Sequence, residues 1–276
     1  MTKQPLPTYY ISHGGGPWPW MAERGETRFG QLEQSLHAMR REIGEAPRAV
    51  LVVSGHWETR GFEISSSPHP TMEFDYYGFP DWAYHIRYDA PGSPVLAAHI
   101  VDLLQQGGVA STLNPERGFD HGTFSLMKPI YPEAQMPIVQ LSVQAGYDPD
   151  LHLRVGRLLA PLRDEGVLII GSGSSFHNMR ALMSGGGQAD SRLFDRWLTD
   201  TLVKERGDAR AGLLQNWTSA PAARAAHPKE DHLVPLFVAV GAADDEAGVR
   251  VYHEDAFLGN AAMSSYRFGE APALQD

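Results

Sequence analysis

The 276-residue sequence predicts one α/β domain whose central sheet, largely parallel or mixed, is flanked by helices, with a C-terminal hairpin added. Short apolar runs rich in β-branched residues recur between glycines, serines and prolines, which is typical of buried strands. Segments with helical periodicity fall between or after these runs, and this alternation places helices on both faces of a sheet. Because no stretch resembles an interdomain linker, we expect a single catalytic domain over 1–276.

Each element is predicted from its local pattern. Buried strands are expected in four apolar runs, at 8–12, 49–55, 136–143 and 166–173. Helices are expected in five periodic segments, near 29–43, 94–107, 150–164, 191–206 and 232–242. Asp231 is a plausible N-cap of the last helix, where Pro235 is tolerable only within the first turn. The tail VRVYHEDAFLGNAAMSSYRFG predicts a hairpin that turns near Gly259 and Asn260 and joins the sheet.

Two irregular regions interrupt this pattern. Residues 65–94 contain five prolines and seven aromatic residues. A loop this long inside a compact domain is usually functional, so we expect an aromatic active-site loop, although a packed cover over the sheet edge explains it equally well. Residues 207–230 form a more polar connector, which we expect to be mobile.

Composition excludes several function classes. The sequence has no cysteine, which removes disulfides, thiolate nucleophiles and Cys-ligated metal centres. A formal net charge of −10 argues against nucleic acid or an anionic membrane as a partner. No apolar run is long enough to span a membrane, and the N-terminus lacks the apolar region of a secretory signal, so the expected location is cytoplasmic.

Histidines follow the predicted strands at the end where open α/β sheets bind ligands. His13, His56 and His177 come after three of the four strands. His121 lies in a glycine-flanked turn that enters a helix, and His232 lies at the start of the last helix. Each could be structural if taken alone, but a buried imidazole is costly without a partner, and a shared position favours a shared partner. The placement therefore predicts a catalytic metal site, since imidazole is the commonest metal nitrogen ligand.

Other chemistries fit the sequence less well. The Gly-Gly-Gly-Pro run after His13 lacks the spacing of a phosphate loop, and GSGSS at 171–175 lacks the G-x-S-x-G frame of a serine nucleophile. No HExxH sequence is present. His37, His99 and His152 lie in helix-patterned segments and are expected to be solvated or half-buried.

Six stretches together carry a family resemblance: ISHGGGP, VVSGHWETRG, FDYYGFP, GFDHGTFSLMKPIYPEAQMPIVQLSV, SGSSFHN and EDHLVPLFVAVGAA. They resemble the class III extradiol ring-cleaving dioxygenases, in the branch of single-chain 4,5-DOPA dioxygenases, which are relatives of the protocatechuate 4,5-dioxygenase catalytic subunit. The resemblance runs from residue 8 to residue 265, nearly the whole chain.

The resemblance implies a role for each histidine of the strand ends. It implies that His13, His56 and His232 bind the metal. His227 does not fall on a ligand position of the family, but it lies five residues from His232 and is kept as a rival for the third position. His177 is implied as the second-sphere acid/base, which can become a fourth ligand in some metal-loaded forms. His121 is implied as the residue that lines the oxygen side of the pocket.

The implied activity is non-haem, Fe(II)-dependent extradiol cleavage of a catecholic ring with O2, which gives a ring-opened semialdehyde and needs no separate small subunit. Three neutral ligands, in place of two histidines and a carboxylate, weaken discrimination against zinc. We therefore expect Fe(II) for activity and regard Zn(II) as compatible with the purified protein. A zinc-dependent hydrolase on the same histidines and a non-catalytic metal-binding relative are the alternatives.

The aromatic loop supplies the expected substrate wall. Phe74, Tyr76, Tyr77 and Trp82 are suited to a flat aromatic guest. Three cations lie near the histidine segments and could meet a substrate carboxylate, although a surface charge is the simpler interpretation of each: Arg60, Arg180 and Lys128.

Overall fold

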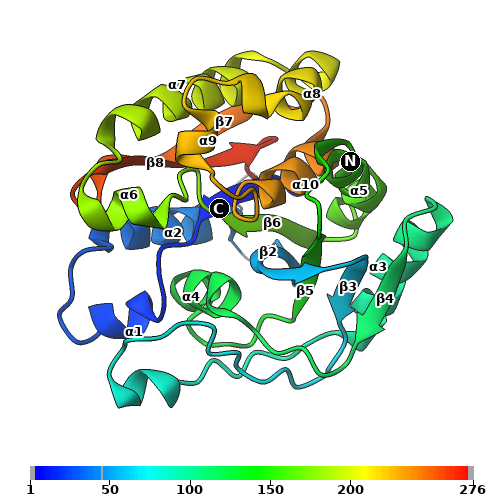
Figure 1. Ribbon diagram of the computed structural model, residues 1–276. Coiled ribbons are helices and arrows are strands. Elements are labelled where there is room, and N and C mark those ends of the chain that lie inside the picture. The colour runs from blue at the N-terminus through cyan, green and yellow to red at the C-terminus, as the bar shows by residue number, and fades with distance from the viewer. Residues whose placement is uncertain (1–3, 45, 273–276) are drawn as a thin grey trace.

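One eight-stranded mixed sheet runs through the computed structural model, which describes residues 4–44 and 46–272 (Figure 1). The strand order is β4-β3-β5-β2-β6-β1-β8-β7. The strands are β1 (Thr8–Ser12), β2 (Ala49–Thr59), β3 (Phe62–Ser65), β4 (Ser111–Asn114), β5 (Ile138–Gln144), β6 (Val167–Gly173), β7 (Gly248–Phe257) and β8 (Ala261–Phe268).

The four predicted strands form the centre of the sheet. β5, β2, β6 and β1 are neighbours and run parallel, and Val50 of β2 pairs with both Ile138 and Leu168. The predicted hairpin is also confirmed, because β7 and β8 are antiparallel and β8 pairs antiparallel with β1. β3 and β4 were not predicted, because each has only four residues and β4 is partly exposed at the sheet edge.

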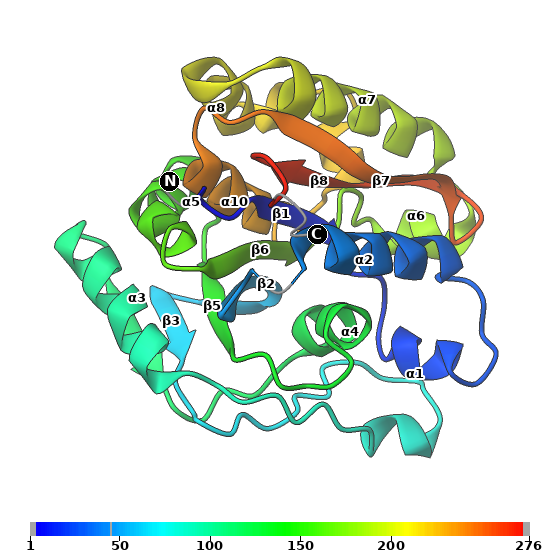
Figure 2. The same cartoon turned by 180° about the vertical axis from the view of Figure 1, so that it is seen from behind.

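Helices cover both faces of this sheet, as predicted. α10, α5 and α7 pack on one face and α2 and α4 on the other, which Figure 2 shows from behind. The helices are α1 (Trp18–Ala22), α2 (Gly30–Ile43), α3 (Pro94–Gln106), α4 (His121–Ile130), α5 (Pro149–Leu159), α6 (Met179–Ser184), α7 (Gln188–Lys204), α8 (Gly207–Gln215), α9 (Ala223–Ala226) and α10 (Val234–Ala243).

The connector at 207–230 contains more structure than its sequence suggested. It includes α8, a short 3-10 turn at Trp217–Ser219, and α9. Leu214 and Trp217 are buried in the core. Its mobility stays a prediction.

Helix α10 is buried at every position, which explains its apolar sequence. This helix can lie close to β6 because the strand has glycines, which carry no side chain, at the positions that face the helix. A Cβ atom on Gly171 would lie 2.3 Å from the carbonyl oxygen of Pro235, which falls in the first turn of α10 as required. The N-cap is Leu233, so the prediction that Asp231 caps this helix was wrong.

Residues 66–93, between β3 and α3, are irregular as predicted, apart from a 3-10 turn at Asp81–Tyr84. This segment, drawn in cyan, runs beneath α1 and α4 in Figure 1. It is held to the start of α4 by a bridge between Met72 and Phe119. No helix in the described part of the chain is both long and apolar enough to cross a membrane, and the cytoplasmic location stays a prediction.

Candidate metal centre

Three histidines from distant parts of the chain meet at the carboxyl ends of the central strands. His13 directly follows β1, and its backbone N–H donates to the carbonyl oxygen of Gly173 at the end of β6 (3.0 Å). His56 lies in β2 where the pairing with β5 shifts between Ser54 and Glu58. His232 comes two residues before α10. His13 and His56 come together because parallel strands end at one edge of the sheet, and His232 reaches the same edge because its carbonyl oxygen accepts from the backbone N–H of Ser174, just after β6 (3.0 Å).

The facing ring nitrogens are close together. The Nε2 atom of His56 lies 3.2 Å from Nε2 of His13 and 3.0 Å from Nε2 of His232. The single Nε2 of His56 cannot donate a proton to both neighbours, so hydrogen bonding alone does not explain the cluster. Two nitrogens that bind one metal at about 2.1 Å lie about 3.0 Å apart at a right angle and about 3.4 Å apart in a tetrahedron. The spacing therefore fits a shared metal ion.

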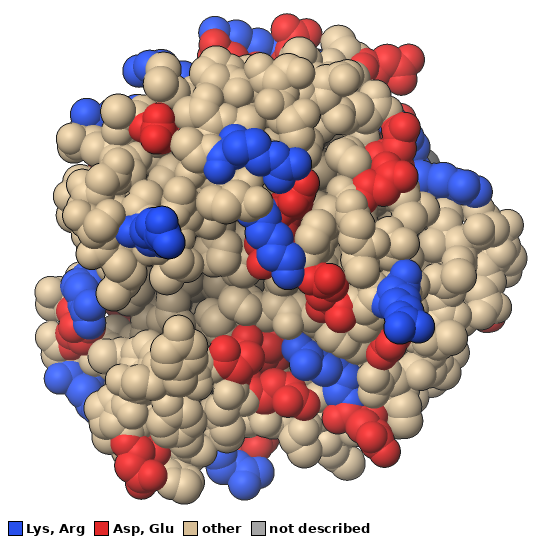
Figure 3. Space-filling model, in the orientation of Figure 1, with Lys and Arg blue, Asp and Glu red and all other residues tan. Residues whose placement is uncertain are grey.

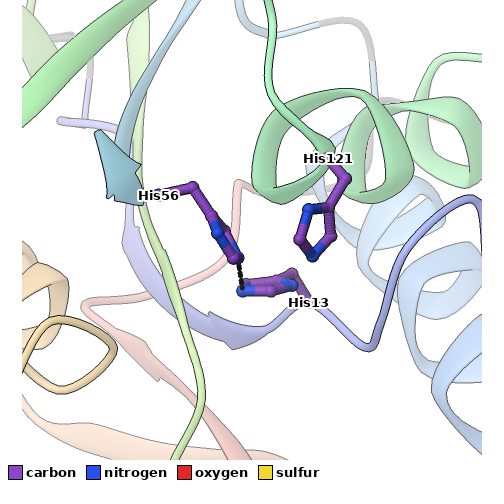
Figure 4. Close-up of side chains that lie close together, drawn as sticks. All are labelled: His13, His56 and His121. Carbon is purple, nitrogen blue, oxygen red and sulfur yellow. Dashed lines mark hydrogen bonds between the residues drawn. The ribbon is translucent and has the colours of Figure 1, made fainter. Parts of the chain in front are cut away.

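Two other histidines flank this group. His121, the first residue of α4, has its ring centroid 4.0 Å from that of His56, and Figure 4 shows its ring facing those of His56 and His13. His177 stacks on His232 with centroids 3.4 Å apart. One ligand atom from each of His13, His56 and His121 lies within 4.8 Å of the other two, so the geometry also offers His121 as a third ligand.

The rival ligand His227 lies elsewhere. It is fully buried, and its Nε2 atom is 3.1 Å from the carbonyl oxygen of Ser175. Burial lowers its pKa to about 3, so the ring is neutral and can donate to that carbonyl. It belongs to neither group of clustered ligand atoms found in the described residues.

Two carboxylates, which the sequence did not mark for this role, each join one predicted ligand to one flanking histidine. Asp75 places Oδ2 3.2 Å from Nδ1 of His56 and Oδ1 2.8 Å from Nδ1 of His121. Asp231 places Oδ1 3.1 Å from Nδ1 of His232 and 3.6 Å from Nδ1 of His177. A carboxylate facing Nδ1 orients an imidazole so that Nε2 of His56 and of His232 is left for the ion. In the sequence, only its position next to His232 could have marked Asp231 as a partner of that histidine.

The charges of the site suit a cation. Burial, followed by the neighbouring histidines, lowers the pKa values of His13 and His56 well below the usual range, and it lowers that of His232 to about 4. Burial works to raise the pKa values of Asp75 and Asp231, but the contacts with histidines outweigh it and lower both. At neutral pH the site therefore offers neutral imidazole ligands beside two carboxylates.

The predicted aromatic wall is only partly close to the histidines. The ring of Tyr76 lies 6.0 Å from that of His121, and its hydroxyl donates to the carbonyl oxygen of Ala83 (2.6 Å). Trp82 stacks under Arg24, and the side chain of Tyr77 is 92% exposed. Phe74 lines a pocket of about 630 Å³ that no clustered histidine borders, so this pocket does not mark the metal site. The substrate roles of Phe74, Tyr76, Tyr77 and Trp82 stay predictions.

A second pocket, of about 560 Å³, opens beside the site. His177 and Asp231 line it together with the cations Arg180 and Lys229. Figure 3 shows that this face is hollowed below α6, with a basic side chain over that helix. Of the other predicted cations, Lys128 pairs with Glu23 at 3.4 Å.

Comparison with known proteins shows the family to which the chain belongs. The family model for the catalytic LigB subunit of aromatic ring-opening dioxygenase matches residues 7–269. The chain is 38% identical to a 4,5-DOPA dioxygenase extradiol of Beta vulgaris, covering 95% of this chain and 96% of that one. The corresponding Escherichia coli protein is 31% identical, with coverage of 98% and 97%.

A third relative, dioxygenase tasH of Hapsidospora irregularis, is 37% identical over 92% of this chain and 82% of its own. The crystal structure of the uncharacterized protein JW3007 from Escherichia coli K12 superposes with a TM-score of 0.75 at 28% identity, covering 96% of this chain and all of that one. The chain therefore belongs to the family of the catalytic LigB subunit of aromatic ring-opening dioxygenases and is an extradiol dioxygenase.

Proposed function

We propose that the enzyme is a non-haem Fe(II)-dependent extradiol dioxygenase that cleaves a catecholic ring with O2 to a ring-opened semialdehyde. The observation that carries this proposal is that Nε2 of His56 lies 3.2 Å from Nε2 of His13 and 3.0 Å from Nε2 of His232. Three neutral nitrogen ligands would leave other positions of an ion open for small ligands. When bound, a ferrous ion would hold both catechol oxygens and O2 and transfer charge between them.

We assign the acid/base role to His177. Its ring borders the open pocket, and its Nδ1 atom lies 3.6 Å from Asp231, whose negative charge would stabilise a protonated imidazole. Imidazole suits proton transfer at neutral pH, because its ordinary pKa is close to 6.5. His177 would therefore accept a hydroxyl proton of the catechol and later return it.

His121 would serve the oxygen side of the site. Its Nδ1 atom is engaged with Asp75, so Nε2 is the nitrogen left for the side of the ring that faces His13 and His56 (Figure 4). From this position it would donate a hydrogen bond to dioxygen as negative charge develops on it. We keep His232 as the third ligand, because its Nε2 atom contacts that of His56 directly while its Nδ1 atom faces Asp231.

The substrate assignment draws on the relatives named 4,5-DOPA dioxygenase extradiol. We infer that the substrate is a catechol. Its aromatic ring would pack against four side chains of the loop: Phe74, Tyr76, Tyr77 and Trp82. These relatives match over nearly their whole length, so we expect no separate small subunit. Zn(II) would fit the same three nitrogens, and a zinc-dependent hydrolase is the activity that the test must exclude.

The test is oxygen uptake by anaerobically prepared, Fe(II)-loaded protein with a panel of catechols that includes DOPA, caffeate and protocatechuate. We expect O2 to be consumed one-for-one with the appearance of a yellow ring-opened product, and no turnover with Zn(II). A fully Fe(II)-loaded protein that consumes no O2 with any catechol would overturn the proposal.

The ligand set is tested separately by metal analysis. Substitution of His13, His56 or His232 by Ala should abolish tight metal binding. His121→Ala should retain the metal, as should the control His99→Ala on the surface of α3. Loss of metal from His121→Ala with retention in His232→Ala would reverse the assignment of the third ligand.

A further inference from the structure

The loop at 66–93 supplies one side chain to the histidine cluster, the carboxylate of Asp75. The loop has little regular structure of its own, yet both oxygens of Asp75 contact histidines on other elements, His56 on β2 and His121 on α4. Oδ1 also accepts from the backbone N–H of His121 (3.1 Å). Asp75 is thus a link between this loop and two parts of the site.

The rest of the loop tip packs against the same region. Tyr76 lies edge-on to His121, as described above, and Phe79 fills the space over the turn that follows His13. A Cβ atom on Gly16 would lie only 2.5 Å from the ring of Phe79. The segments that carry His13, His56 and His121 therefore all contact the loop between residues 75 and 79.

We propose that Asp75 is a positioning residue through which metal binding seats the 66–93 loop over the site. This inference rests on the proposed metal site. A cation at Nε2 of His56 withdraws electron density from the ring, which makes the Nδ1–H group a better donor to Asp75. Metal binding therefore strengthens the contact that holds the loop, and by linkage the seated loop strengthens metal binding to the same degree.

Asp81 provides a matched control on the same loop. Its carboxylate also faces a histidine, His85, at 3.4 Å, but its side chain is 96% exposed. The pair belongs to neither cluster of possible metal ligands in the described residues, which are His13, His56 and His121 on one side and His177, Asp231 and His232 on the other. Asp75→Asn and Asp81→Asn remove the same charge from the same segment. A difference between them reports the position of Asp75 rather than the net charge of the loop.

The experiment measures amide hydrogen exchange of the full chain, apo and loaded with Zn(II) as a redox-inert probe, together with the Zn(II) dissociation constant from chelator competition. In the wild type, metal should slow exchange across 66–93. Asp75→Asn should raise the dissociation constant about 10–100-fold, the usual effect of losing such a partner. The exchange difference between apo and loaded forms should also disappear in this variant, whereas Asp81→Asn should match the wild type in both measurements.

Equal metal affinity and equal loop protection in the two variants would overturn the inference while the proposed function, tested by catechol-dependent O2 uptake, still stood. Unchanged loop exchange on metal loading of the wild type would also overturn it, and this comparison needs no variant to fold. A wild type that binds no metal would overturn the inference and the proposed function together.

Discussion

Gly173→Ala should damage the metal site from a position that contributes no side chain to it. Gly173 ends β6, and a Cβ atom there would lie 2.0 Å from the carbonyl oxygen of His232. That carbonyl accepts hydrogen bonds from the hydroxyl of Tyr10 (2.8 Å) and the backbone N–H of Ser174 (3.0 Å). The backbone of His232 is therefore held in place where the added methyl group would push against it.

The size of the effect follows from these distances. Carbon–oxygen contacts of this kind below 3.0 Å are essentially never seen, so His232 must shift by about 1 Å. Overpacking costs about 1–3 kcal/mol, and a buried carbonyl that loses a partner costs about 1–3 kcal/mol more. We expect a loss of about 2–6 kcal/mol in the free energy of unfolding. A displacement of about 1 Å in a catalytic group also costs on the order of 10²-fold in rate.

The assay compares urea unfolding and metal affinity of Gly173→Ala with those of Gly212→Ala. Gly212 lies within α8 with no heavy atom within 4 Å of its added Cβ, so alanine there should stabilise the helix by about 0.5–1 kcal/mol. A Gly173→Ala protein with the unfolding midpoint and metal affinity of the wild type would refute the reasoning.

Three further predictions concern the acid/base residue, a buried histidine and the pocket rim. His177→Ala should keep its metal and lose about 10²–10⁴-fold in turnover, which metal analysis and O2 uptake measure together; unchanged turnover would remove the role. Burial lowers the pKa of His152 from 6.5 to about 4, and its Nε2 atom accepts from the backbone N–H of Gln144. Below about pH 6.5 the unfolded chain takes up a proton that the folded chain does not. The free energy of unfolding therefore decreases as the pH is lowered, by about 1 kcal/mol from pH 7.5 to pH 5.5. Urea unfolding at both pH values checks this, and His152→Gln should lose that share of the dependence. Arg180 lines the pocket beside His177 and pairs with no acidic residue in the described chain. Arg180→Gln should raise KM about tenfold for catechols with a carboxylate and not for those without one, whereas Arg192→Gln on α7 should change neither.

Much of the fold follows from local sequence. The run at 8–12 is apolar and β-branched, and β1 has the predicted bounds. The meeting of His13 and His56 also follows, since both lie where parallel strands end at a shared edge. His152 was expected to be solvated or half-buried, and this was wrong. It is fully buried, because the neutral ring is satisfied at both nitrogens by backbone groups.

The carboxylates of the site were not predictable in the same way. Asp75 is 19 positions from His56 and 46 from His121, and only the path of an irregular loop brings it to them. The position of Asp231 before an apolar segment predicted that it caps the helix, but the helix begins later, with Pro235 in its first turn. Its side chain is thereby left to face His232 and His177.

The histidine cluster joins residues from nearly opposite ends of the chain, with 219 positions between His13 and His232. β1 lies between β6 and β8 in the sheet, although both of them are made much later in synthesis. A growing chain therefore cannot assemble the cluster until most of the protein has left the ribosome and folded. An ion that needs the whole cluster therefore binds late, after the segments that carry its ligands have been made and folded, and from then on its binding stabilises the fold.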